Sequence, residues 1–118
     1  MTITVNGIDY QANTSLGMVK KLETFYKMPL TQLLAAVSEY TVEQLLSLLS
    51  RIVEAGSPDF KSALEDQWGY MKLQVTVQKA LAEMAFAGTP NEVNEQLEAA
   101  IPDENAKNHL RRLLGLQV

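Results

Sequence analysis

Few residues of this chain are of types that carry out chemistry. Among its 118 residues there is no cysteine and a single histidine, His109. The chain can therefore form no disulfide and has no thiolate nucleophile. It also lacks the cysteine and histidine ligands of a usual metal site. His109 also has no acidic residue three or four positions before it on the helix predicted there. The sequence predicts an ordinary surface histidine, with no metal and no cofactor.

Carboxylates are more abundant, but their positions suggest a structural role. Five of them fall in or near the first turns of the last two predicted helices or on solvent faces, where a negative charge stabilises the positive end of the helix dipole. They are Glu92, Glu95, Glu98, Asp103 and Glu104. None has the apolar sequence context that acid–base catalysis needs. Phosphate-loop, zinc-protease, serine-hydrolase and EF-hand motifs do not occur in the sequence. We therefore expect a protein that is not an enzyme.

The basic residues do not predict a nucleic-acid surface. The formal net charge is −4, whereas phosphate binding needs a clustered basic face. Two basic doublets, Lys20-Lys21 and Arg111-Arg112, complement the negative ends of predicted helices. In a helix-turn-helix, the helix from Thr41 would be the one that contacts DNA. Its exposed face carries one positive residue, Arg51, and two glutamates, which would repel phosphate. We expect no nucleic-acid partner.

Composition and length predict one folded domain over residues 1–118. Apolar residues make up 47% of the chain and charged residues 20%, which is ordinary for a globular protein. No apolar run approaches the roughly 18 to 20 residues that span a bilayer, and the start, Met1 to Val5, lacks the features of a signal peptide. We expect no membrane partner and a protein that stays in the cytoplasm.

The elements that must position these residues begin with a hairpin over residues 1–12. Apolar and polar residues alternate in two short runs, and Asn6-Gly7 between them favours a type I′ turn. A lone hairpin is marginal in water, so we expect its apolar face to pack on the helices.

The helical period over residues 14–114 predicts about seven helices. Two capping boxes, Thr41 with Gln44 and Thr89 with Glu92, indicate two of the helix starts. Ser57-Pro58 indicates another start, and Gly56 and Gly115 indicate two ends. The predicted fold class is mainly α: a small multi-helix bundle with a short N-terminal β-hairpin.

The predicted helix from Tyr70 to Ala87 is apolar on two flanks. One stripe contains Leu73, Val77, Leu81 and Met84, and the other contains Met71, Val75, Ala82 and Phe86. A domain of this size has few layers with which to cover both stripes. We therefore predict a homo-oligomer that self-associates through Trp68, Tyr70, Met71 and Val75. The alternative is that these residues belong to the intramolecular core.

The last predicted helix should be held by apolar residues and should end at the surface. Leu110, Leu113 and Leu114 recur at helical spacing and are expected to pack on the body of the domain. Gly115 should stop the helix, and Val118 should then lie unpacked.

The order of elements resembles a known family. The likeness lies in the hairpin Ile3 to Tyr10 (ITVNGIDY), in Val19-Lys20-Lys21-Leu22-Glu23, and in the pair Leu33 to Val37 and Thr41 to Leu46. This layout, best over residues 1–56, resembles the tail assembly chaperones of long-tailed (siphovirus-type) bacteriophages. It includes no invariant catalytic motif.

The resemblance implies a function in virion morphogenesis. Such a chaperone coats the long, helical tape measure protein in the host cytoplasm and helps to recruit tail tube subunits, and it is not part of the mature virion. In such families a programmed ribosomal frameshift also yields a longer product, whose extra part recruits the tail tube protein. The alternatives are a small helical virion component, such as a head-tail connector, and a helical regulatory adaptor. A virion component would be found in purified particles, whereas a chaperone would not.

Overall fold

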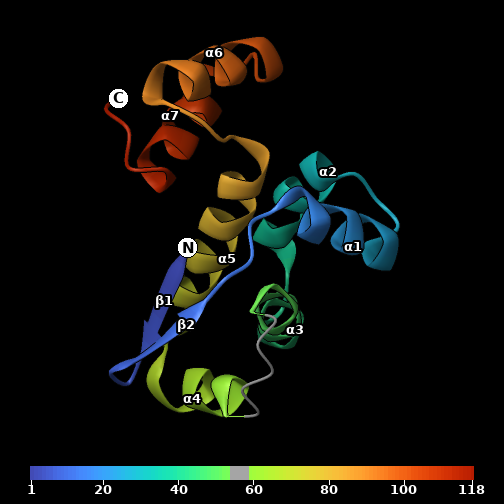
Figure 1. Cartoon of the computed structure of the whole chain (residues 1–118), viewed down its shortest axis with the longest axis vertical. Coiled ribbons are helices and arrows are strands. Elements are labelled where there is room, and N and C mark those ends of the chain that lie inside the picture. The colour runs from blue at the N-terminus through green and yellow to red at the C-terminus, as the bar shows by residue number, and fades with distance from the viewer. Residues whose placement is uncertain (54–58) are drawn as a thin grey trace.

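The computed structural model describes residues 1–53 and 59–118. Over these residues the protein is mainly helical, with a two-stranded hairpin at its N-terminus, as predicted (Figure 1). The helices in chain order are α1 (Leu16–Tyr26), α2 (Leu30–Ala36), the short 3-10 helix η1 (Val37–Glu39), α3 (Val42–Ile52), α4 (Phe60–Gln67), α5 (Tyr70–Ala85), α6 (Pro90–Ala100) and α7 (Glu104–Leu113).

The hairpin has the predicted turn. β1 (Thr2–Val5) pairs with β2 (Ile8–Gln11) in antiparallel register. Asn6 and Gly7 have φ angles of 51° and 77°, and a type I′ turn requires positive φ at both of its central residues.

The apolar face of the hairpin packs on the helices, as expected. Ile3, Val5 and Tyr10 are buried, and β1 contacts α4. The ring centroids of Tyr10 and Phe60 lie 4.7 Å apart. The hairpin is therefore part of the main core, although Ile8, the register partner of Val5 beside the turn, is 55% exposed.

The two predicted capping boxes are both present. The Gln44 backbone N–H donates to the Thr41 hydroxyl at 3.3 Å, and the Thr41 N–H donates to the Gln44 side-chain oxygen at 2.9 Å. Thr89 and Glu92 make the equivalent pair of contacts at the start of α6. Each box satisfies backbone donors that would otherwise have no partner in the helix.

The boundaries between α3 and α4 differ from the prediction. α3 ends at Ile52 with Val53 as its C-cap, before the predicted stop at Gly56, which lies outside the described residues. α4 begins at Phe60 after Asp59. The predicted start, Ser57-Pro58, also lies outside the described residues.

Two clusters of buried side chains make up the core. The larger one joins the hairpin with α1 to α5. The smaller one joins the C-terminal end of α5 with α6 and α7; its buried members are Ala82, Phe86, Val93, Leu97 and Leu110. Figure 1 shows α6 and α7 at one end of the molecule, with α5 leading to them. The C-terminal pair of helices is therefore anchored mainly on α5.

Only one of the two apolar flanks of α5 is buried along its whole length. Leu73, Val77, Leu81 and Met84 are buried, as are Ala82 and Phe86 from the second stripe. Met71 and Val75 of that second stripe are 63% and 43% exposed. The exposure of the second stripe changes along α5 because α6 and α7 cover the C-terminal half of the helix but not its N-terminal end.

The chain ends at the surface, as predicted. Gly115 has a φ of 74°, and its N–H donates to the Arg112 carbonyl at 3.2 Å, while the Leu116 N–H donates to the Arg111 carbonyl at 2.8 Å. This is the Schellman arrangement of a glycine-terminated helix. Val118 is exposed.

Candidate functional site

The described part of the chain holds no group of three or more His, Cys, Asp and Glu side chains that could bind a metal ion. His109 is exposed, and its Nε2 atom lies 3.3 Å from Oε1 of Gln78. Among the described residues, this contact pairs the imidazole with an amide, which is neither an acid nor a nucleophile. The other candidate sites are hollows on the surface.

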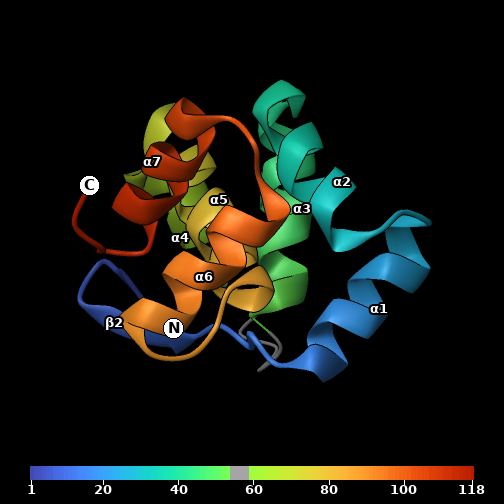
Figure 2. The same cartoon turned by 90° about the horizontal axis from the view of Figure 1, so that it is seen from above.

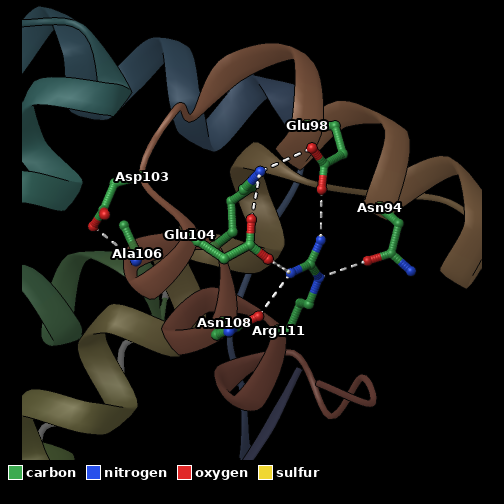
Figure 3. A network of polar contacts seen from close by, with 8 residues as sticks. Asn94, Glu98, Asp103, Glu104, Ala106, Asn108 and Arg111 are labelled. Atoms are coloured by element: carbon green, nitrogen blue, oxygen red, sulfur yellow. Dashed lines mark hydrogen bonds and ion pairs between the residues drawn. The ribbon is translucent and has the colours of Figure 1, made fainter.

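A dense polar network joins α6 to α7 (Figure 3). The Lys107 ammonium lies 2.8 Å from a Glu98 oxygen and 3.0 Å from a Glu104 oxygen, and the lysine side chain is only 8% exposed. The Arg111 guanidinium contacts the same two carboxylates at 3.0 and 3.4 Å. It also donates to Asn94 at 2.9 Å.

This network adds contacts to the roles that were predicted for three of its members. Glu104 lies in the first turn of α7 and Arg111 in its last turn, as predicted, and the Glu98 side chain is 57% exposed. Glu98 also pairs with Lys107 and Arg111 across the two helices, whereas Glu104 pairs with the same two cations within α7. Spacing within one helix reveals the Glu104–Lys107 pair, three residues apart, but not the contacts of Glu98. Hydrogen bonds from Lys107, and then from Arg111, hold the pKa of Glu98 below its usual value. The Lys107 hydrogen bond likewise lowers the pKa of Glu104.

The same hydrogen bonds raise the pKa of Lys107, with Glu98 contributing more than Glu104. Two cations thus face two carboxylates, and all four charges are compensated within the network. A balanced network of this kind fixes the angle between α6 and α7 and has no free charge with which to bind a ligand. It is a structural feature that supports the site.

An apolar groove lies beside this network, between α2 and α7, with a volume of about 430 Å³. Figure 2 shows these two helices on either side of α5. The side of the groove along α2 and η1 is formed by Thr31, Leu34, Ala35 and Ser38, and the side along α7 is formed by Ala106, His109, Leu110 and Leu113. Gln78 and Phe86 from the α5 region and Ala100 and Ile101 at the end of α6 complete it.

The wall along α7 is one face of that helix, and the wall along α2 continues into η1. On both sides the lining residues follow the spacing i, i+3, i+4, i+7, which is the spacing of a contact face in helix packing. Small residues, Ala35, Ala100 and Ala106, lie among the lining positions and permit the close approach of another backbone. The groove therefore has the form of a position for one more helix.

A second hollow of about 360 Å³ adjoins the groove. It shares His109 and Leu113 with the groove and adds Val75, Lys79 and Arg112. Val75 is one of the residues predicted for self-association. His109 and Leu113 thus border both hollows, and the second hollow reaches the exposed apolar end of α5 at Val75.

The four residues predicted for self-association are divided by the structure. Tyr70, Met71 and Val75 are exposed on α5, so the core alternative is wrong for these three. Trp68 is half-buried against the main core. The Lys72 ammonium lies 4.7 Å from the centroid of its ring. The contact between copies itself stays a prediction.

The groove was not predicted from the sequence. Leu110 and Leu113 were assigned to packing, His109 to the surface, and no role was given to Ala35. The signal that could have found the groove is the matching pattern of small, apolar and neutral polar residues at positions 31, 34, 35 and 38 and at positions 106, 109, 110 and 113.

None of the described helices is long and apolar enough to cross a membrane. Comparisons of the chain with protein-family models, with curated proteins and with solved structures gave no match.

Proposed function

We propose that this protein is a tail assembly chaperone of a long-tailed bacteriophage. It binds helical segments of the tape measure protein in the host cytoplasm and helps to recruit tail tube subunits during tail morphogenesis. The observation that carries the proposal is the apolar groove between α2 and α7, whose two walls have the spacing of helix contact faces. The choice of the tape measure protein as the partner is based on the family resemblance of residues 1–56.

The groove suits a chaperone for physical reasons. A tape measure protein is a long helix former, and its apolar stripes must be covered until the tail tube replaces the chaperone. Helix-in-groove recognition buries such a stripe, with a gain of roughly 25 cal/mol for each Å² of apolar surface removed from water. A groove open at the surface can also release its helix, as a transient partner must.

Co-expression with the tape measure protein of the same phage tests the proposal. Wild-type chaperone should keep the tape measure protein in the supernatant and co-purify with it. Ala35→Arg places a long charged side chain in the groove from an exposed helical position and should abolish the complex. Gln32→Arg is the matched control, because Gln32 is also exposed on α2 but does not line the groove. A tape measure protein that binds the Ala35→Arg variant as well as wild type would refute the proposal.

A permanent virion component, such as a head-tail connector, is the second candidate. The exposed Tyr70, Met71 and Val75 favour it, since a fixed contact in a particle would cover them. Mass spectrometry of purified phage particles separates the two functions. The chaperone proposal requires that the protein be absent from them, and one copy or more per particle would support the second candidate.

A homo-oligomer is proposed for the same exposed stripe of α5. Light scattering of the wild-type protein at high micromolar concentration should give a mass above that of one chain, and Met71→Lys should lower it. Met71 is 63% exposed, so this change should leave the fold intact. A strictly monomeric wild-type protein would remove the oligomer from the proposal.

A further inference from the structure

We propose that the groove between α2 and α7 takes an amphipathic helix of the partner protein whose flank carries carboxylates, and that these pair with Lys79 and Arg112. The inference rests on the proposed function, since it specifies the chemistry of the helix that the chaperone binds.

The two cations line the hollow next to the groove. Lys79 and Arg112 line the second hollow, which shares His109 and Leu113 with the groove. Side chains on the flank of a helix lying in the groove would therefore reach them, while its apolar face contacts Leu34, Leu110 and Leu113.

Both cations are available for a partner. Lys79 and Arg112 are exposed, and neither forms an ion pair with any residue that the structure describes. Arg112 contrasts in this respect with its neighbour Arg111, whose charge is used by Glu98 and Glu104.

The second hollow carries charge opposite in sign to that of the whole protein, since it is lined by Lys79 and Arg112. The chain has a net charge of −4, yet no carboxylate is among the described residues that line the two hollows. α2 carries no charged residue. Asp103, which precedes α7, accepts a hydrogen bond from the Ala106 N–H at 3.1 Å as the helix cap. The local field at the second hollow thus favours an acidic ligand.

Two synthetic helical peptides test the inference. They share one apolar face with leucines at i, i+3, i+4 and i+7; one carries glutamates on both flanks and the other carries lysines. On net charge alone the acidic protein would prefer the lysine peptide. The inference predicts the reverse, with about fivefold to tenfold tighter binding of the glutamate peptide at low salt for two exposed ion pairs, and a smaller difference in 0.5 M salt, about the concentration at which such pairs are screened. Fluorescence anisotropy measures both affinities.

Matched charge-reversal variants locate the effect. Lys79→Glu combined with Arg112→Glu should lower the affinity for the glutamate peptide by about fivefold to tenfold and raise that for the lysine peptide. Lys20→Glu combined with Lys27→Glu changes the net charge equally at exposed positions that line neither hollow, and should leave the preference intact.

Equal binding of the two peptides, a preference for lysine, failure of both to bind, or an equal loss in both double variants would overturn the inference. These outcomes are distinguishable from failure of the proposed function. If the charge preference is absent while Ala35→Arg still abolishes the tape measure complex, the inference alone has failed. If wild-type protein forms no complex with the tape measure protein but prefers the glutamate peptide, the proposed function alone has failed.

Discussion

Leu110 connects the smaller core cluster to the groove, and its replacement by alanine measures how firmly α7 is held. The side chain is 6% exposed, belongs to the cluster around Leu97 and also lines the groove. Truncation of a buried leucine to alanine lowers the free energy of unfolding by about 2 to 5 kcal/mol, depending on the cavity that remains. One side of the Leu110 cavity would open into the groove and admit water, so we expect the lower part of this range, about 2 to 3 kcal/mol.

Neighbouring leucines provide an internal scale. Leu97 has no exposed surface, so Leu97→Ala should leave a closed cavity and cost about 3 to 5 kcal/mol. Leu113 is half-buried, so Leu113→Ala should cost only about 1 kcal/mol. Urea unfolding followed by circular dichroism gives the free energies of unfolding. The expected order of cost is Leu97, then Leu110, then Leu113. A larger loss for Leu113→Ala than for Leu110→Ala would refute the assignment of Leu110 as the anchor of α7.

Three further predictions concern other parts of the fold. Thr41→Ala and Thr89→Ala should each lower the free energy of unfolding by about 1 kcal/mol, because each removes a capping box; thermal unfolding measures the loss, and an unchanged midpoint in both variants would contradict the cap assignment. The lowered pKa values of Glu98 and Glu104 mean that their stabilising contribution is complete above the ordinary value of 4.5 and is lost as the pH falls through the lower folded-state values. Unfolding curves recorded from neutral to acid pH should therefore be less steeply pH-dependent below 4.5 for the Glu98→Gln, Glu104→Gln double variant than for wild type, and parallel curves would contradict the network. Fusion of a small folded domain after the exposed Val118 should leave the thermal midpoint nearly unchanged, whereas deletion of α7 should lower it; a large loss on fusion would show that the chain end is packed.

Local signals made most of the elements predictable. The Asn6-Gly7 turn depends on two adjacent residues that tolerate positive φ, and the capping boxes depend on residues three positions apart. Such patterns are complete within one turn of the chain, so they do not depend on the tertiary arrangement. The 3.6-residue period gave the helices for the same reason, although α3 ends at Ile52, before the predicted glycine.

Contacts between helices were not predictable in this way. Lys107 and Glu98 lie nine residues apart on different helices, and Arg111 and Glu98 lie thirteen residues apart. The turn after α6 brings them together, and the sequence pattern of each helix alone shows only its own dipole and its own faces. The prediction therefore assigned these charges to the helix ends and solvent faces. Of the ion pairs in the network, spacing within one helix could show that of Glu104 with Lys107, three residues apart, but not those of Glu98.

The groove could not be predicted for the same reason: the sequence shows the apolar face of each helix but not which helices pair. The sequence correctly indicated more apolar helix surface than a small domain can cover, and placed the excess on the N-terminal half of α5. Met71 and Val75 do lie exposed there. A second excess arises because α7 packs on α5, with Leu110 in the smaller core cluster, while α2 packs on α1, α5 and η1. The faces of α2 and α7 that remain border one hollow without closing it. Each of these faces has the residue pattern of a helix that packs on another helix. Only the tertiary arrangement shows that no helix in the described part of this chain fills the space between them.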